Sequence, residues 1–126
     1  MKKSILILAE DIAASNLLKL VLTPVGFHVQ TIFESTKAVD AIEVYKPDIV
    51  LIDVQSLKDG LSVCREIRDH YAMEELPIVL LANCTYQQEE KVSHAAGVNT
   101  HLYKPMSRHE LINKIELILT EKFAYV

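Results

Sequence analysis

Three acidic residues and one lysine are the side chains of this sequence that are best suited to chemistry. Asp53 closes the apolar run 49–52, Glu10 and Asp11 follow the first apolar run of the chain, and Lys104 follows the last. A buried carboxylate is costly unless it is paired, hydrogen-bonded or bound to a metal. An aspartate can also act as a nucleophile and form an acyl phosphate. Asp53 is therefore either a strand-end residue that binds turn amides or a reactive group.

The same four residues are suited to a hard cation and a phosphoryl group. Mg²⁺ commonly binds one or two carboxylates together with phosphate oxygens and water. Three carboxylates near one ammonium group leave a negative charge that a divalent cation would neutralise, and a lysine adds a mobile positive charge for phosphate. Histidines and cysteines show no zinc-site spacing. We expect the two cysteines, Cys64 and Cys84, to be small core residues with free thiols.

Short apolar runs alternate with helical patterns along the whole chain. The expected strands cover 4–9, 27–32, 48–53, 77–82 and 100–103, and the expected helices cover 12–23, 35–46, 61–71, 85–97 and 107–123. Strands that are apolar throughout are typical of parallel sheets covered on both faces. The sequence therefore predicts an α/β fold with a parallel five-stranded sheet between helices.

Local signals mark several of the expected helix ends. They are Ser35 as an N-cap, Thr85 with Gln88 and Ser107 with Glu110 as capping boxes, and Gly97 at a C-cap. In an open α/β sheet the functional crevice lies at the carboxyl ends of the strands. Glu10, Asp11, Asp53 and Lys104 all follow such ends, so we expect them to face one crevice.

Length and composition predict one domain over residues 1–126. The chain has 126 residues, 50% of them hydrophobic and 24% charged, and a net charge of −4. The negative charge disfavours direct nucleic-acid binding. The apolar run behind the basic N-terminus is too short for a secretion signal, and no stretch approaches a membrane span. We expect a cytoplasmic protein without a membrane partner.

The order of these elements and three short motifs resemble the receiver domain of bacterial response regulators. The motifs are "IVLID" ending at Asp53, "DG" at 59–60 and "YKP" at 103–105. The offsets in residue number are 43 from Glu10 to Asp53 and 51 from Asp53 to Lys104. The resemblance covers essentially the whole chain. It implies a flavodoxin-like (βα)5 fold with strand order 2-1-3-4-5, the order that is general for such receivers.

The resemblance also implies roles for individual residues. Asp53 would accept a phosphoryl group, Lys104 would pair with that group, and Lys104–Pro105 would be a cis peptide bond. Mg²⁺ would be held by an acidic pair, Asp53 and the main-chain carbonyl of Gln55. The donor would be a sensor histidine kinase or a phosphotransfer protein. The output, an effector protein or a domain beyond residue 126, would bind the fourth helix, fifth strand and fifth helix.

The metal site departs from the family pattern. Aligned without gaps, the acidic pair falls on Ala9 and Glu10, with Asp11 third. We expect Glu10 to be a metal ligand and Asp11 to be mainly a helix cap with a weak role at the metal. Because Mg²⁺ demands near-ideal octahedral geometry, the changed ligands predict weak binding.

The switch positions depart as well. Ala82 stands where receivers carry a Thr or Ser that donates a hydrogen bond to the phosphoryl group, and His101 stands at the switch aromatic. Leu57 replaces a proline, which affects loop stiffness more than chemistry.

Two functions from different classes therefore stay open. One is a receiver that accepts and relays a phosphoryl group, with slow self-hydrolysis and no turnover of a metabolite. The other is a pseudo-receiver that binds partners independently of phosphorylation. A flavin-binding flavodoxin is disfavoured, because no Ser/Thr/Gly-rich phosphate loop follows the first strand.

Overall fold

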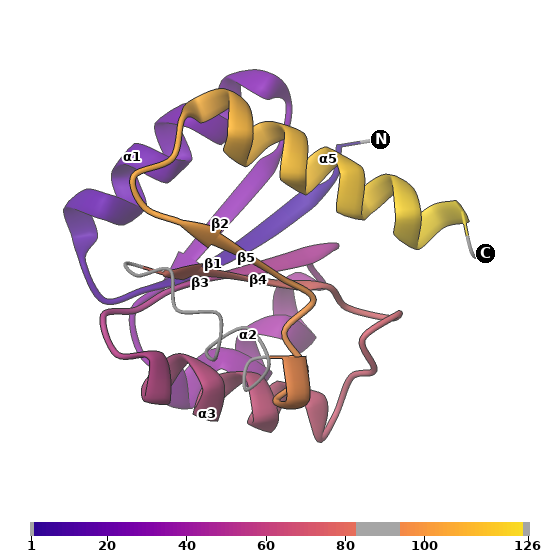
Figure 1. Cartoon of the computed structure of the whole chain (residues 1–126). Coiled ribbons are helices and arrows are strands. Elements are labelled where there is room, and N and C mark those ends of the chain that lie inside the picture. Colours follow the sequence, from indigo (N-terminus) through magenta and orange to yellow (C-terminus); the bar gives the residue numbers. More distant parts are fainter. Residues whose placement is uncertain (1, 83–93, 125–126) are drawn as a thin grey trace.

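The computed structural model describes residues 2–82 and 94–124 and shows one parallel sheet between two layers of helices (Figure 1). The strand order is β2-β1-β3-β4-β5, and every neighbouring pair is parallel. The strands are β1 (Ser4–Ala9), β2 (His28–Ile32), β3 (Ile49–Asp53), β4 (Ile78–Ala82) and β5 (Thr100–Tyr103). The predicted flavodoxin-like fold and its strand order are confirmed.

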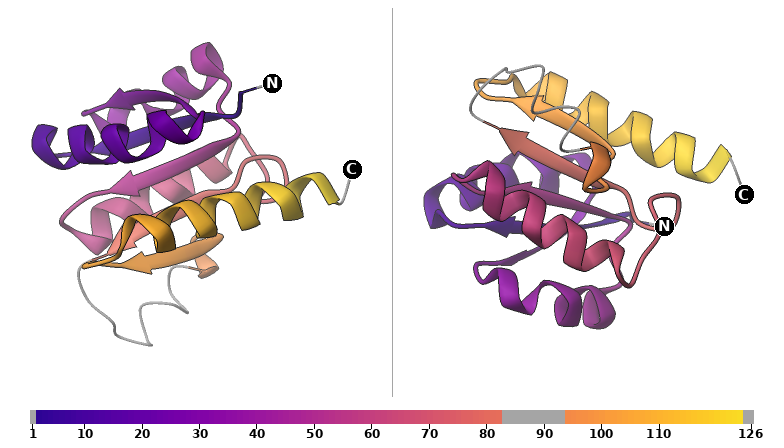
Figure 2. Two further views of the ribbon diagram at one scale, coloured as in Figure 1. Left: turned by 90° about the horizontal axis from the view of Figure 1, so that it is seen from above. Right: turned by 60° about the horizontal axis from the view of Figure 1, so that its bottom comes forward.

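Helices cover both faces of the sheet. They are α1 (Ile12–Leu22), α2 (Ala38–Tyr45), α3 (Leu57–Arg68) and α5 (Arg108–Ala124), with short 3-10 turns at Thr23–Val25 and Ser35–Lys37. Helices α1 and α5 lie on one face, and α2 and α3 lie on the other (Figures 1 and 2). The helix expected over 85–97, its capping box at Thr85 and Gln88, and Cys84 lie largely or wholly outside the described residues.

The two faces of the sheet carry separate hydrophobic clusters. Leu6 and Ile52 pack with α2 and α3, whereas Ile7 and Leu51 pack with α1 and α5. Side chains of a strand alternate between faces, so a strand covered on both sides must be apolar at every position. This explains the uninterrupted apolar runs. The prediction that Cys64 is a core residue is confirmed, because it is fully buried on the core-facing side of α3.

Two predicted helix starts are wrong. Ser35 begins a 3-10 turn, and α2 starts at Ala38 without a side-chain cap. Helix α3 spans Leu57–Arg68 and not 61–71, because the Ser56 hydroxyl accepts a hydrogen bond from the Asp59 amide at 3.2 Å and caps it earlier. Gly60 thus lies inside a helix, where a Cβ would meet Leu80 Cδ1 at 3.0 Å. The glycine lets α3 lie close to the sheet.

Other predicted helix ends are confirmed. Asp11 accepts a hydrogen bond from the Ala13 amide at 3.0 Å and caps α1. Ser107 accepts one from the Glu110 amide at 3.0 Å at the start of α5. Gly97 has a φ of 98°, the left-handed conformation expected at a C-cap. Within residues 2–82 and 94–124, no helix is long and apolar enough to cross a membrane.

Arg68 links the end of α3 to the segments that lead into β4 and β5. Its guanidinium donates to the carbonyls of Leu76 at 2.7 Å and Gly97 at 2.9 Å, and to the Asn99 side chain at 2.6 Å. Burial lowers the pKa of Arg68, and the nearby Cys64 and Glu74 oppose that shift. These hydrogen bonds tie the end of α3 to the segments that precede β4 and β5. The two strands lead to residues 82 and 104 at the other end of the sheet.

Candidate functional site

Asp53 lies at the carboxyl end of the central strand of the sheet. It is 7% exposed and is the one buried charged residue in the described part of the chain. Its neighbours across the sheet are Ala9 of β1 and Leu81 of β4. All five positions of β3 are buried, so the fold places this carboxylate where apolar strands surround it. Asp53 thus lies at the carboxyl end of a parallel strand, where open α/β sheets place their functional crevice.

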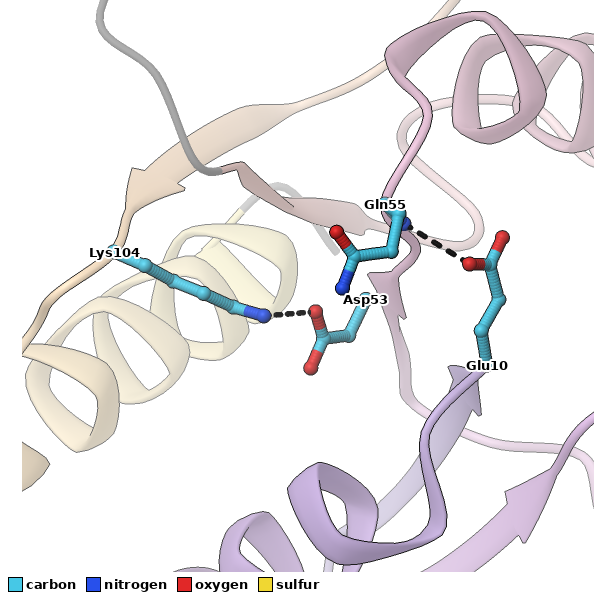
Figure 3. A network of polar contacts seen from close by, with 4 residues as sticks. All are labelled: Glu10, Asp53, Gln55 and Lys104. Carbon is cyan, nitrogen blue, oxygen red and sulfur yellow. Dashed lines mark hydrogen bonds and ion pairs between the residues drawn. The ribbon is translucent and has the colours of Figure 1, made fainter.

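Lys104 supplies the charge that partners Asp53. Its Nζ atom donates to Asp53 Oδ1, and the ammonium group reaches the carboxylate from the loop after β5 (Figure 3). The backbone positions this lysine, because its amide donates to the Ala82 carbonyl at 2.8 Å. The Lys104–Pro105 peptide is cis, as the resemblance implied. The structure thus brings together two residues that are 51 positions apart.

Glu10 lies on the other side of the segment that follows Asp53. Its amide donates to the Asp53 carbonyl at 3.4 Å, and its carboxylate Oε2 accepts from the Gln55 amide at 3.2 Å (Figure 3). The second contact could not be found from the residue types, because every residue except proline offers a backbone N–H donor. Glu10 is exposed to solvent.

The other two positions of the expected acidic cluster point elsewhere. Asp11 caps α1, and Ala9 is buried in the core beneath α1 and α5. Across residues 2–82 and 94–124, no three His, Cys, Asp or Glu side chains group closely enough to hold a metal ion. Near the end of β3 the structure thus places two carboxylates, that of Asp53 and that of Glu10, whose side chain reaches the Gln55 amide.

The two switch positions lie on neighbouring strands, β4 and the edge strand β5. Ala82 ends β4 opposite Tyr103, and its methyl group offers no hydrogen-bond donor. The His101 ring stacks on that of Tyr103, with ring centroids 5.9 Å apart and planes 7° from parallel. Two residues apart on a strand, these side chains share a face of the sheet. Asn83 and Thr85, two other polar side chains near this position in the sequence, lie outside the described residues.

Comparisons with known proteins agree with this geometry. A family model described as the response regulator receiver domain matches residues 5–116. The fold is similar to NtrX from Brucella abortus, with a TM-score of 0.85 and 23% identity over 99% of this chain. This chain spans 28% of the length of that NtrX chain.

Two further structures match over almost their full length. A putative response regulator from Chloroflexus aurantiacus J-10-fl has a TM-score of 0.81 and 26% identity, covering 95% of this chain and 99% of its own. The BeF3-activated N-terminal receiver domain of RstA from Klebsiella pneumoniae has a TM-score of 0.82 and 23% identity, with coverages of 93% and 98%. Both likenesses thus cover more than nine-tenths of this chain.

Proposed function

The chain belongs to the response regulator receiver domains of two-component signalling, and we propose from this premise that Asp53 accepts a phosphoryl group. The observation that carries the proposal is the Lys104 ammonium bound to a buried carboxylate at the end of the central strand. The lysine holds one oxygen of this carboxylate at the carboxyl ends of the strands, where open α/β sheets bind their ligands. We propose that Lys104 pairs with this carboxylate in the free protein and with the phosphoryl group during the transfer.

The transfer is a substitution at phosphorus. An Asp53 carboxylate oxygen forms a bond to the phosphorus of a phosphohistidine, and the phosphorus–nitrogen bond breaks. The imidazole nitrogen keeps the bonding electrons and later takes a proton from solvent. The Lys104 ammonium pairs with the phosphoryl oxygens and offsets their charge. Hydrolysis by water then returns the carboxylate and inorganic phosphate, which makes the activity a slow self-dephosphorylation.

The oxygen donors around Asp53 fit one Mg²⁺ ion of low affinity. Asp53, Glu10 and the Gln55 carbonyl would hold it, because Mg²⁺ needs only one or two carboxylates when phosphate and water complete its shell. When bound, the cation supplies positive charge that stabilises the transferring phosphoryl group. The alanine at position 9 removes one carboxylate from the family pattern, so we expect weak binding. Asp11 contributes little, because its carboxylate caps α1.

Receiver domains interact with histidine kinases and effector domains, and we propose the same classes of partner here. The donor is a sensor histidine kinase or a phosphotransfer protein in the cytoplasm. The output binds the surface formed by the helix expected over 85–97 together with β5 and α5. We propose no role in direct nucleic-acid or membrane binding for the receiver itself.

One observation favours a second function. Position 82 is an alanine, so the hydroxyl that would join the phosphoryl group to the switch is missing. A domain with this site could keep its fold and a phosphorylation-independent binding surface without relaying a signal. This is the pseudo-receiver.

Amide spectra with Mg²⁺ and beryllofluoride, an analogue of the aspartyl phosphate, separate the two functions. We expect shifts around Asp53 that extend to β5 and α5 in the wild type and are absent from Asp53→Asn. Asp59→Asn is the matched control, because Asp59 is an exposed carboxylate in the first turn of α3. Shifts confined to the surroundings of Asp53 would favour the pseudo-receiver. A spectrum unchanged in the wild type would contradict phosphoryl acceptance.

A further inference from the structure

Glu10 contacts the segment after β3 at two points. Its amide donates to the Asp53 carbonyl, and its Oε2 accepts from the Gln55 amide two residues further along (Figure 3). One residue of the β1–α1 connection therefore holds both ends of the three-residue segment 53–55. Ala9 pairs with Asp53 in the sheet and buries its side chain in the core, and the Asp11 carboxylate caps α1.

The Glu10 carboxylate is the acceptor that the structure gives the Gln55 amide. Gln55 lies between the last residue of β3 and Ser56, the N-cap of α3, so it belongs to neither element. Its amide therefore has no partner fixed by a helix or a strand ladder, and here a side chain serves. The N-terminus of α3 also carries a partial positive charge, which favours a carboxylate beside it. Both effects direct the Glu10 side chain toward the segment.

We infer that Glu10 is a positioning residue that holds the segment 53–55 in place before any cation binds. This inference rests on the proposed function, since the segment carries both the phosphoacceptor and the Gln55 carbonyl. A nucleophile held by the protein itself meets its donor without first ordering the loop. A carboxylate oxygen has lone pairs to spare, so this role is compatible with Glu10 also binding Mg²⁺.

Three substitutions separate the hydrogen bond from the charge. Glu10→Gln keeps an acceptor oxygen at the same reach and removes the charge. Glu10→Ala removes both. Glu10→Asp keeps the charge and shortens the reach by one methylene. Glu66→Ala is the control, because Glu66 is an exposed carboxylate on α3 away from the segment.

The direct test is solvent exchange of the Gln55 amide proton, measured by NMR with EDTA present. We expect exchange about 2- to 12-fold faster in Glu10→Ala and Glu10→Asp, the range that one hydrogen bond of ordinary strength gives. Glu10→Gln and Glu66→Ala should stay within about two-fold of the wild type, by the same measure. Equal exchange in the wild type and Glu10→Ala would overturn the inference, and so would Glu10→Gln exchanging as fast as Glu10→Ala.

A second readout connects the contact to phosphoryl acceptance. At saturating Mg²⁺, Glu10→Ala should form the acyl phosphate several-fold more slowly than Glu10→Gln, because both variants lack the carboxylate charge and only Glu10→Gln keeps the acceptor for the Gln55 amide. Equal rates in these two variants would refute a positioning role. A wild type that accepts no phosphoryl group would refute the proposed function instead, and the exchange data in EDTA would still decide the role of Glu10 in the free protein.

Discussion

The Asp53–Lys104 pair should couple the two residues by about 2 kcal/mol of folding free energy. The Asp53 side chain is 6% exposed and that of Lys104 is 32% exposed. Fully exposed pairs contribute about 0–1 kcal/mol, whereas breaking a fully buried pair costs about 3–5 kcal/mol. One buried partner and one partly hydrated partner place this pair between the two limits. The coupling matters for function, because the lysine must leave the carboxylate to meet the phosphoryl group.

A double-mutant cycle measures this coupling. Urea unfolding of the wild type, Lys104→Met, Asp53→Asn and the double variant gives four free energies of unfolding. Lys104→Met should destabilise the wild type by about 2 kcal/mol or slightly more, since it leaves a buried carboxylate without a cation. The same change should cost little when residue 53 is Asn. A coupling below about 0.5 kcal/mol, the level of an exposed pair, would refute the reasoning.

Three further predictions concern other parts of the fold. Burial raises the pKa of the Cys64 thiol to about 11 from 9.0, against the opposing charges of nearby arginines. The folded protein then keeps a proton that the unfolded chain loses, so between pH 9 and 11 the free energy of unfolding should fall by about 2–3 kcal/mol more in the wild type than in Cys64→Ala. Gly97→Ala should destabilise by about 2–3 kcal/mol, because its Cβ would meet Arg68 Cγ at 2.5 Å at a φ of 98°. Gly26→Ala, which shares the left-handed backbone and has nothing within 4 Å of its Cβ, should cost only about 1 kcal/mol; equal losses in urea would contradict this account. Ala82→Thr should prolong the acyl phosphate roughly ten-fold or more by adding a hydrogen bond to a charged oxygen, and Ala82→Val should not; equal lifetimes by mass spectrometry would show that the missing hydroxyl is unimportant.

Much of the fold was predictable because burial on both faces leaves a plain pattern. The apolar runs at 4–9 and 49–52 mark two central strands, and parallel topology brings the ends of such strands to one edge. Asp53 and Lys104 are close together because β3 and β5 both end at that edge. The start of α3 was not predictable from periodicity alone, since Gly60 resembles a turn residue and here serves close packing against β4.

Contacts between side chains and backbone groups were the least predictable part of the site. The Glu10 carboxylate binds an amide that exists at every residue, so only the path of the chain after β3 singles out Gln55. The acceptors of Arg68 are likewise mainly carbonyls from separate segments. The role of Asp11 was easier to predict from the sequence, because a helix cap binds an amide only two residues away in the same turn.

The most direct test of the central claim is the intact mass of the protein after incubation with Mg²⁺ and a small-molecule phosphodonor. We expect one phosphoryl adduct on the wild type and on Asp59→Asn, and none on Asp53→Asn. A wild type without an adduct, or an adduct that persists in Asp53→Asn, would contradict the assignment of Asp53 as the phosphoacceptor.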